Sequence, residues 1–486
     1  MSSFLNNSLY SFLDLQSELK VCLAAVAFCL LSSLNLYAQE ANIDFVIVNE
    51  IIIKGNKKTK GNVILRELNF HRGDTLQMSN LAKRLTKNEQ RLQSIGLFIL
   101  VKVNIKDWNL DSNRADIEIT VRENWYIYPY LIAELADRNF NVWRREFNYS
   151  LDRVNYGLAI NHINLTGHKD KLRVKWQSGF TRKYEVAYDY PYWNGRWGVS
   201  TNFLYTENRE MAYRTRFNKP LFYKAADERK LYNSYRASVG VSNRSNAIIT
   251  QSLRFEYIQT SVDSFVTQTL NPSYFNDQKS AVKYFALDYN LKFDNTKYPL
   301  YPSKGLRFDF TVRKDGIGIF NDVNNLTLAF TTEHYTSLTD RLFISSRVKF
   351  KTNLSNNPVP YFLNNSIGYK RDVITGYQLY TLDGKDFMLI NNSVHYRILE
   401  KTYTLKSWMP KVLQMMDAKL FGRVNFDYGY SRDPYHGTDN SYVNSNQYGY
   451  GAALDLIIYN NLTFTLELGI TRHGEKGLFY SSQVNF

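Results

Sequence analysis

Residues 125–486 are dominated by segments of about ten residues in which polar and apolar side chains alternate, separated by turn residues. Because successive side chains of a strand point to opposite faces, this alternation predicts β-strands. Clear examples are residues 171–179, 184–190, 200–205, 252–257, 305–311 and 462–469. About sixteen strands fit into the region. So large a sheet would expose hazardous edges unless it closed, so we predict an antiparallel barrel.

A soluble β-sandwich or propeller is the alternative, but the sequence has no repeat of blade length. The chain ends in Phe486, which shares one face of an alternating strand with Val484 and Tyr480. A terminal aromatic residue on such a strand is typical of outer-membrane barrels. We therefore predict an all-β transmembrane barrel in which Tyr480, Val484 and Phe486 mark the strand at its seam.

One long apolar run lies near the start, at residues 21–36, and Tyr37-Ala38-Gln39 follow it. The run is short for a membrane anchor, the alternative interpretation, and we predict a signal peptide over residues 1–38. Both cysteines, Cys22 and Cys29, fall inside it. The mature chain is therefore expected to lack disulfides and thiolate metal sites.

The formal net charge of the chain is +15. Its basic residues are scattered along the predicted strands, and an exported protein rarely meets nucleic acid. We therefore expect contact with outer-membrane lipid and lipopolysaccharide, and no nucleic-acid partner. A simply solvated basic surface is the alternative.

Residues 39–124 have a different pattern, which predicts a small α/β domain in the order strand, helix, helix, strand, strand. The predicted strands cover residues 47–54, 97–105 and 114–121, and the predicted helices cover 62–68 and 79–94. Ser79 is the expected N-cap of the second helix.

This domain resembles a POTRA domain in IKGNKKT (53–59), ILREL (64–68), Gly73-Asp74 and LQSIGLFILVKV (92–103). The resemblance implies one periplasmic POTRA domain at residues 39–124, followed by the barrel at 125–486. Domains of this family bind extended chains by adding a strand to a sheet edge.

The barrel region resembles the BamA/TamA superfamily of outer-membrane assembly proteins. DNTKYPLYPSKGLRF (294–308) matches the family's periplasmic turn, which implies roles there for Asp294, Pro299, Pro302 and Gly305. NFDYG (425–429) resembles a motif of the barrel wall with an inward aspartate, Asp427. ITGY, formed by Ile374, Thr375, Gly376 and Tyr377, stands where the family has an inward-folded loop motif followed by five strands.

In that motif an arginine usually precedes Gly-Tyr and contacts an acidic residue of the wall, but Thr375 cannot form such an ion pair. We expect residues 352–386 to fold into the lumen, with Arg371 paired to Asp427 as a compensating contact. The alternative is that Lys370 and Arg371 are solvated and packing alone holds the loop.

The sequence has no HExxH, GxSxG or phosphate-loop motif. We therefore expect no enzymatic activity, no cofactor and no metal site. The resemblance implies an assembly or translocation protein of the outer membrane that receives unfolded client outer-membrane or secreted proteins, with possible accessory periplasmic or lipoprotein subunits. A passive pore or secretion transporter, or a structural or lipid-handling barrel, are the alternative functions.

Overall fold

A computed structural model describes residues 44–245, 248–296, 301–320, 322–405, 415–435, 439–459 and 462–484. The predicted signal peptide, Pro299 and Phe486 lie outside these residues. The chain forms two compact units, a small N-terminal α/β domain and a large antiparallel sheet.

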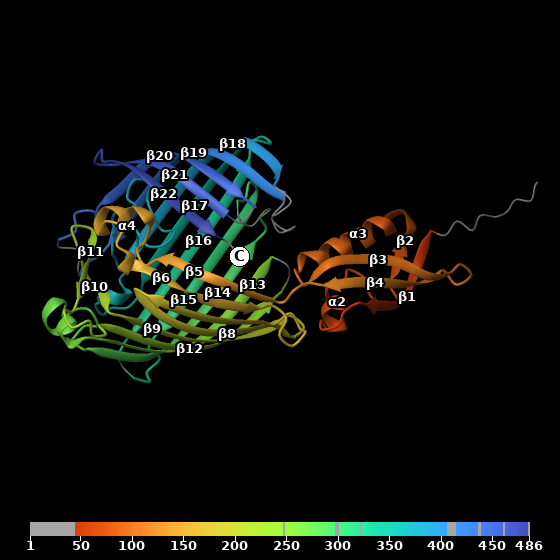
Figure 1. The fold of residues 1–486 in the computed structure, drawn as a ribbon, viewed down its shortest axis with the longest axis horizontal. Helices are drawn as coiled ribbons and strands as arrows, with labels where there is room; N and C mark the ends of the chain where they lie inside the picture. Colours follow the sequence, from red (N-terminus) through yellow and green to blue (C-terminus); the bar gives the residue numbers. More distant parts are fainter. Residues whose placement is uncertain are drawn as a thin grey trace, which may run out of the picture. The chain divides into compact units, whose positions relative to one another are not determined.

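The α/β domain is built from a four-stranded sheet in the order β2-β1-β4-β3 and two helices (Figure 1). Its elements are β1 Phe45–Lys54, α2 Gly61–Glu67, β2 Thr75–Gln77, α3 Met78–Ser94, β3 Phe98–Asn109 and β4 Arg114–Glu123. β1 runs parallel to β4 and antiparallel to β2. Fully buried side chains of α2, α3 and β4, such as Ile64, Leu92 and Ile119, form its core.

The expected order of elements is present, but the structure adds β2 and corrects the start of α3. β2 leads directly into the helix, so Gln77 in extended conformation occupies the N-cap position and contributes no side-chain cap. Ser79 lies within the helix, so its prediction as the N-cap is wrong. The continuous strand-to-helix path leaves no separate capping turn.

The second unit is a sixteen-stranded antiparallel sheet that curves round as a barrel (Figure 1), as the alternating pattern predicts. Its strands follow the chain in order from β5 to β22, except that β9 pairs directly with β12. The intervening β10 (Glu210–Arg216) and β11 (Lys219–Lys224) form a separate hairpin.

The bounds of the sixteen strands are β5 Ile127–Leu135, β6 Val154–His162, β7 Lys171–Gly179, β8 Thr181–Asn194, β9 Trp197–Asn208, β12 Tyr232–Arg244, β13 Ile249–Val262, β14 Ala281–Asp294, β15 Gly305–Asp315, β16 Asn325–Ser337, β17 Leu342–Asn353, β18 Asp386–Thr404, β19 Met415–Arg432, β20 Asn446–Ile458, β21 Leu462–Thr471 and β22 Lys476–Val484. The five strands expected after ITGY are β18 to β22.

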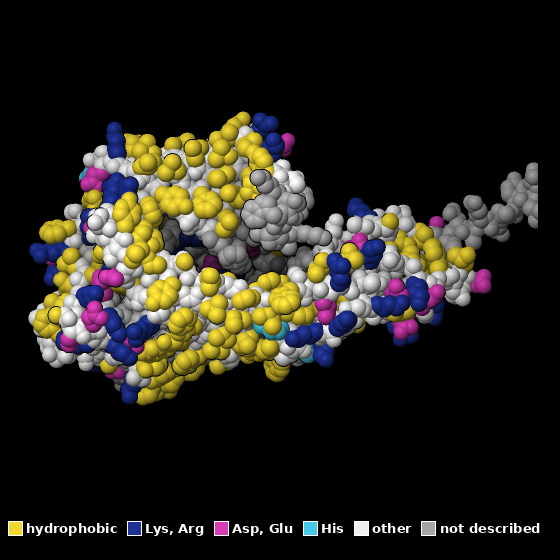
Figure 2. All heavy atoms as spheres, in the orientation of Figure 1, with side chains coloured by type: hydrophobic (Ala, Val, Ile, Leu, Met, Phe, Trp, Pro, Cys, Tyr) yellow, Lys and Arg dark blue, Asp and Glu magenta, His cyan; other side chains and the backbone are white. Residues whose placement is uncertain are grey.

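The barrel wall is polar inside and apolar outside, which β19 illustrates. Asn425 and Asp427 are buried, whereas the alternate residues Val424 and Phe426 are 61% and 56% exposed. Figure 2 shows hydrophobic side chains gathered over the outer surface of the strands. This inversion of the soluble pattern suits a wall that faces lipid. Within the described residues, no helix is long and apolar enough to cross a membrane.

The two ends of the barrel differ in the length of their connections. One end carries short turns such as residues 163–170 and 195–196. The other carries long excursions, among them the β10–β11 hairpin, residues 354–385 and α4 (Phe140–Phe147) between β5 and β6. Short turns at one end and long loops at the other are the usual arrangement of outer-membrane barrels.

Candidate functional site

The connection between β17 and β18, residues 354–385, folds against the inner wall of the barrel. We call it the inward loop. Ile374 and Tyr377 are almost completely buried, and the Tyr377 hydroxyl donates a hydrogen bond to Gln447 of β20 (Oη–Oε1 2.8 Å). The ITGY segment therefore forms the part of the loop that is docked on β19, β20 and β21.

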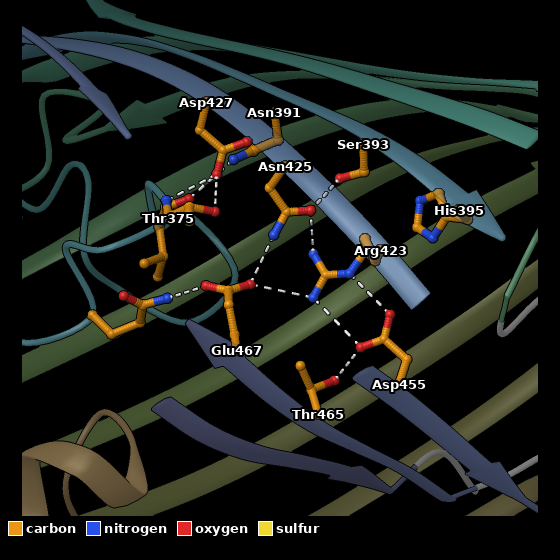
Figure 3. Close-up of polar contacts among 12 residues, drawn as sticks. Thr375, Asn391, Ser393, His395, Arg423, Asn425, Asp427, Asp455, Thr465 and Glu467 are labelled. Atoms are coloured by element: carbon orange, nitrogen blue, oxygen red, sulfur yellow. Dashed lines mark hydrogen bonds and ion pairs between the residues drawn. The ribbon is translucent and has the colours of Figure 1, made fainter. Parts of the chain in front are cut away.

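Thr375 holds the tip of the inward loop to Asp427. Its backbone N–H and its hydroxyl both donate to Oδ2 of the carboxylate, at 2.8 and 2.7 Å (Figure 3). Thr375 thus reaches the acidic wall residue that the resemblance assigns to an arginine, with two hydrogen bonds in place of an ion pair. A comparison of side-chain charges in the sequence would miss this contact, because both donors are neutral and one of them is a backbone N–H.

Glycines in the wall let the loop backbone approach closely. A Cβ at Gly449 of β20 would lie 1.8 Å from the Thr375 carbonyl oxygen, and one at Gly469 of β21 would lie 2.5 Å from the Gly376 nitrogen. Gly376 itself has φ of +88°, a conformation that glycine adopts without strain. The docking surface is therefore a glycine patch, formed by Gly449, Gly451 and Gly469, that any side chain would fill.

A network of charged groups lies on the wall beside this contact (Figure 3). Arg423 of β19 pairs with Asp455 of β20 (Nε–Oδ2 2.9 Å) and Glu467 of β21 (Nη2–Oε2 3.3 Å). Gln378 of the inward loop donates a hydrogen bond to the same Glu467. The arginine that balances the acidic wall thus belongs to the wall itself, and the loop adds neutral donors.

The structure does not bring Arg371 to Asp427. Arg371 is exposed, and the Asp427 carboxylate is buried against Thr375. The loop carboxylate Asp372, next to Arg371, instead accepts from two cations of β17, Arg347 and Lys349, each at 2.6 Å. The polarity is therefore reversed relative to the prediction, with the anion on the loop and the cations on the wall. Because Asp372 turns towards β17, Arg371 beside it projects to solvent.

A second buried contact joins the inward loop to the β10–β11 hairpin. The Asp383 carboxylate accepts hydrogen bonds from Tyr369 (Oη–Oδ1 2.6 Å) and from Thr215 of β10. Burial raises the pKa of this carboxyl above its ordinary value, although the hydrogen bonds from Thr215 and Tyr369 oppose the shift. At the hairpin tip, Asn218 accepts at its backbone oxygen from the Thr381 N–H (2.8 Å). The loop is thus fixed at both the wall and the end of the barrel.

The predicted periplasmic turn lies between β14 and β15, at the end of the barrel with short turns. Asp294 accepts from the Thr296 N–H and hydroxyl, at 2.9 and 2.6 Å, and Gly305 has φ of +121°. Pro302 is buried. Tyr301, which the sequence analysis did not single out, hydrogen bonds to Asp455 (2.7 Å) and so reaches the network of Arg423. The residues of the motif that the structure describes therefore order the turn rather than line a reactive site.

The terminal strand β22 pairs with β21 and forms the end of the sheet order opposite to β5. Tyr480 lies in its middle, opposite Leu466, and the strand ends at Val484. Among the residues that the structure describes, no three His, Cys, Asp or Glu side chains are grouped so as to hold a metal ion.

Two protein-family models match the chain. A POTRA model, described as a surface antigen variable number repeat, matches residues 46–124, and an Omp85 superfamily domain model matches residues 164–386. The chain belongs to the Omp85 superfamily. It is therefore a barrel of the outer membrane with one POTRA domain on the periplasmic side. The resemblance seen in the sequence motifs is confirmed.

Solved structures of this superfamily share the fold. BamA from Haemophilus ducreyi lacking POTRA domains 1–3 is 13% identical, with a TM-score of 0.57, and the match covers 90% of this chain and 85% of that one. CdiB from Escherichia coli is 10% identical, with a TM-score of 0.56, covering 91% and 76%. No curated protein matches the sequence. Omp85 membership supports protein insertion or secretion-type transport as the general function.

Proposed function

We propose that this Omp85 protein receives unfolded client polypeptides through its POTRA domain and assists their insertion into, or passage across, the outer membrane at the seam between β5 and β22. The carrying observation is the docked inward loop. The inward loop is held inside the lumen by buried hydrogen bonds from Thr375 and Tyr377 and by its close approach to Gly449. The chain's own loop thus occupies space in the lumen. A client is therefore better served by a sheet edge than by the lumen.

The physical basis is backbone pairing. An unpaired peptide group in lipid costs several kcal/mol. A client strand that pairs with a strand edge of the barrel avoids this cost, and burial of its apolar face supplies further free energy. No nucleotide or cofactor is required, and the proposed role is not enzymatic.

The POTRA domain offers one long edge for client capture. Its sheet ends at β2, which has three residues, and at β3, which has twelve. Ile99 and Leu100 of β3 are 49% and 42% exposed. An extended chain could add to β3 through backbone hydrogen bonds while these side chains contact its apolar residues.

The single POTRA domain favours a dedicated or client-specific role over that of a general insertase. The matched Haemophilus ducreyi BamA is named as lacking POTRA domains 1–3, so the full-length protein has at least three such domains. We further propose that basic residues on the barrel contact lipopolysaccharide and anionic headgroups, and that accessory periplasmic or lipoprotein subunits assist.

The seam hypothesis is tested by locking the seam in proteoliposomes. The only cysteines of the chain are Cys22 and Cys29, so introduced pairs after residue 38 have no competitors there. A disulfide between β5 and β22, found by scanning pairs, should block insertion of a urea-unfolded eight-stranded barrel protein, and reduction should restore it.

The matched control carries Leu454→Cys and Leu466→Cys, so that a disulfide joins these two positions. The two residues lie directly opposite each other on β20 and β21, and both face outward. This disulfide locks the wall away from the seam and should leave insertion unchanged. Full activity of the seam-locked protein would exclude lateral insertion. A second measurement compares the ion conductance of the unmodified protein in planar bilayers with that of a variant lacking residues 355–384. Equal conductance of the two proteins would favour a passive pore.

A further inference from the structure

The edge of β22 is occupied at Tyr480 by a side chain. The Tyr480 N–H donates to Oδ1 of Asn141, and Nδ2 of Asn141 donates to the Tyr480 carbonyl oxygen, both at 3.2 Å. β22 is the last strand in the sheet order. Because both of these backbone groups bond to Asn141, they point away from β21 and out of the sheet edge. A carboxamide carries one acceptor and a donor, as a peptide group does. Asn141 therefore makes the pair of bonds that a residue of an adjacent antiparallel strand would make.

α4 lies beside β22 (Figure 1), and its local structure directs Asn141 towards that strand. Asn139 caps its N-terminus by accepting from the Val142 N–H at 2.9 Å, and Asn148 ends it in the left-handed conformation. The Phe140 ring packs edge-on against the Tyr480 ring, with centroids 5.5 Å apart. Asn141 is only 3% exposed. The contact with β22 is thus enclosed by packing, unlike a chance polar contact at a surface.

The same helix is tied to the inward loop through the segment that precedes it. Arg138 donates to the carbonyl oxygens of Gly368, Leu379 and Tyr380, at 3.1, 3.0 and 2.8 Å. Asn139 donates to the carbonyl oxygen of Gln378 at 2.6 Å. α4 and the segment before it therefore bridge the docked loop and the terminal strand.

We infer that α4 is an internal occupant of the β22 edge, which holds the place of an incoming strand and is displaced when that strand pairs. The inference rests on the proposed function and adds its regulation. Asn141 satisfies one residue of β22, whereas a strand of several residues satisfies one residue in every two along the edge. A short or irregular segment therefore cannot replace α4, and a long extended segment can. The device selects client segments that are ready to form a strand.

The test uses purified full-length protein in detergent and a fluorescent peptide with the sequence of residues 476–486, an alternating strand with a terminal aromatic. Asn141→Leu removes both hydrogen bonds at similar size. Asn141→Asp keeps the acceptor and loses the donor. Arg145→Leu changes an exposed residue of the same helix and serves as the control. Heat-modifiable gel mobility verifies that each variant is folded.

Hydrogen exchange of the full-length protein should accelerate by about tenfold or more at Tyr480 in Asn141→Leu, because the substitution removes both hydrogen bonds to that residue. Binding of the fluorescent peptide should tighten by a similar factor. Asn141→Asp should fall between the native protein and Asn141→Leu, and Arg145→Leu should match the native protein. Equal exchange in native protein and Asn141→Leu would overturn the inference.

Two other outcomes separate this inference from the function on which it rests. Equal peptide affinity for native protein and Asn141→Leu, with clear binding to both, would overturn the displacement of α4 and leave strand pairing at the seam intact. Absence of binding to either protein, with accelerated exchange in Asn141→Leu, would refute strand pairing at β22 and the inference together.

Discussion

Thr375→Val tests how much the Thr375 hydroxyl contributes to docking of the inward loop, at the position where the resemblance implies an arginine. The substitution keeps the shape of the side chain and the backbone N–H bond to Asp427, and removes the 2.7 Å bond from Oγ1. A hydrogen bond to an ionised acceptor contributes about 1.5–3 kcal/mol. The docked state should lose stability by about that amount, which raises the population of the undocked loop roughly ten- to hundredfold.

Hydrogen exchange of residues 374–377 measures this population, because the Thr375 amide is protected only while the loop is docked. Thr402→Val is a matched control, since Thr402 donates a 2.6 Å bond to Asp417 near the other end of β18. It should leave exchange at 374–377 unchanged. An acceleration of less than about threefold in Thr375→Val would refute the reasoning and assign docking to the backbone bond and apolar packing.

Three further changes have defined outcomes. Gly449→Ala should undock the loop and accelerate the same exchange, because its Cβ would lie 1.8 Å from the Thr375 oxygen, whereas Gly422→Ala, with its nearest neighbour at 3.5 Å, should not; equal effects would contradict the glycine patch. Arg371→Ala should change the unfolding free energy by less than about 0.5 kcal/mol, because the side chain is exposed, whereas Asp427→Ala should impair client insertion. A comparable loss of client insertion in both variants would support the predicted ion pair. Arg153→Met should destabilise the protein by about 3–5 kcal/mol, measured from the temperature of the gel-mobility transition, because the buried Asp137 carboxylate and the partly buried Glu210 lose their shared cation; an unchanged temperature would mean that these carboxylates find other partners.

The barrel strands could be predicted from the sequence because one physical pattern governs them. Polar residues inside and apolar residues outside alternate with the strand period, so the segment 171–179 coincides with β7, and Leu462 begins both the predicted segment and β21. The POTRA-type helices carry the helical period and were likewise located. β2, with only three residues, is too short for either period to identify it.

The docking partners of the inward loop could not be predicted in the same way. The path of the loop decides which neighbour of Gly376 faces the wall, and tertiary contacts such as those of Asp372 set that path. The glycine patch did leave a signal. Gly449 and Gly451 occur at alternate positions of a strand, where glycine often marks the close approach of another backbone. α4 has eight residues and its role depends on β22, some 340 residues later, which no local pattern encodes.

The order of the docking partners along the chain has a consequence for the protein's own folding. Asp427, Gly449 and Glu467 all follow the inward loop in sequence and belong to β19, β20 and β21. The loop cannot dock until these three strands have formed and paired, and such non-local contacts arise late in folding. Docking of ITGY therefore marks a nascent barrel whose C-terminal strands are complete. A chain truncated before β21 would lack Glu467 and Gly469, which form part of the surface on which the loop docks.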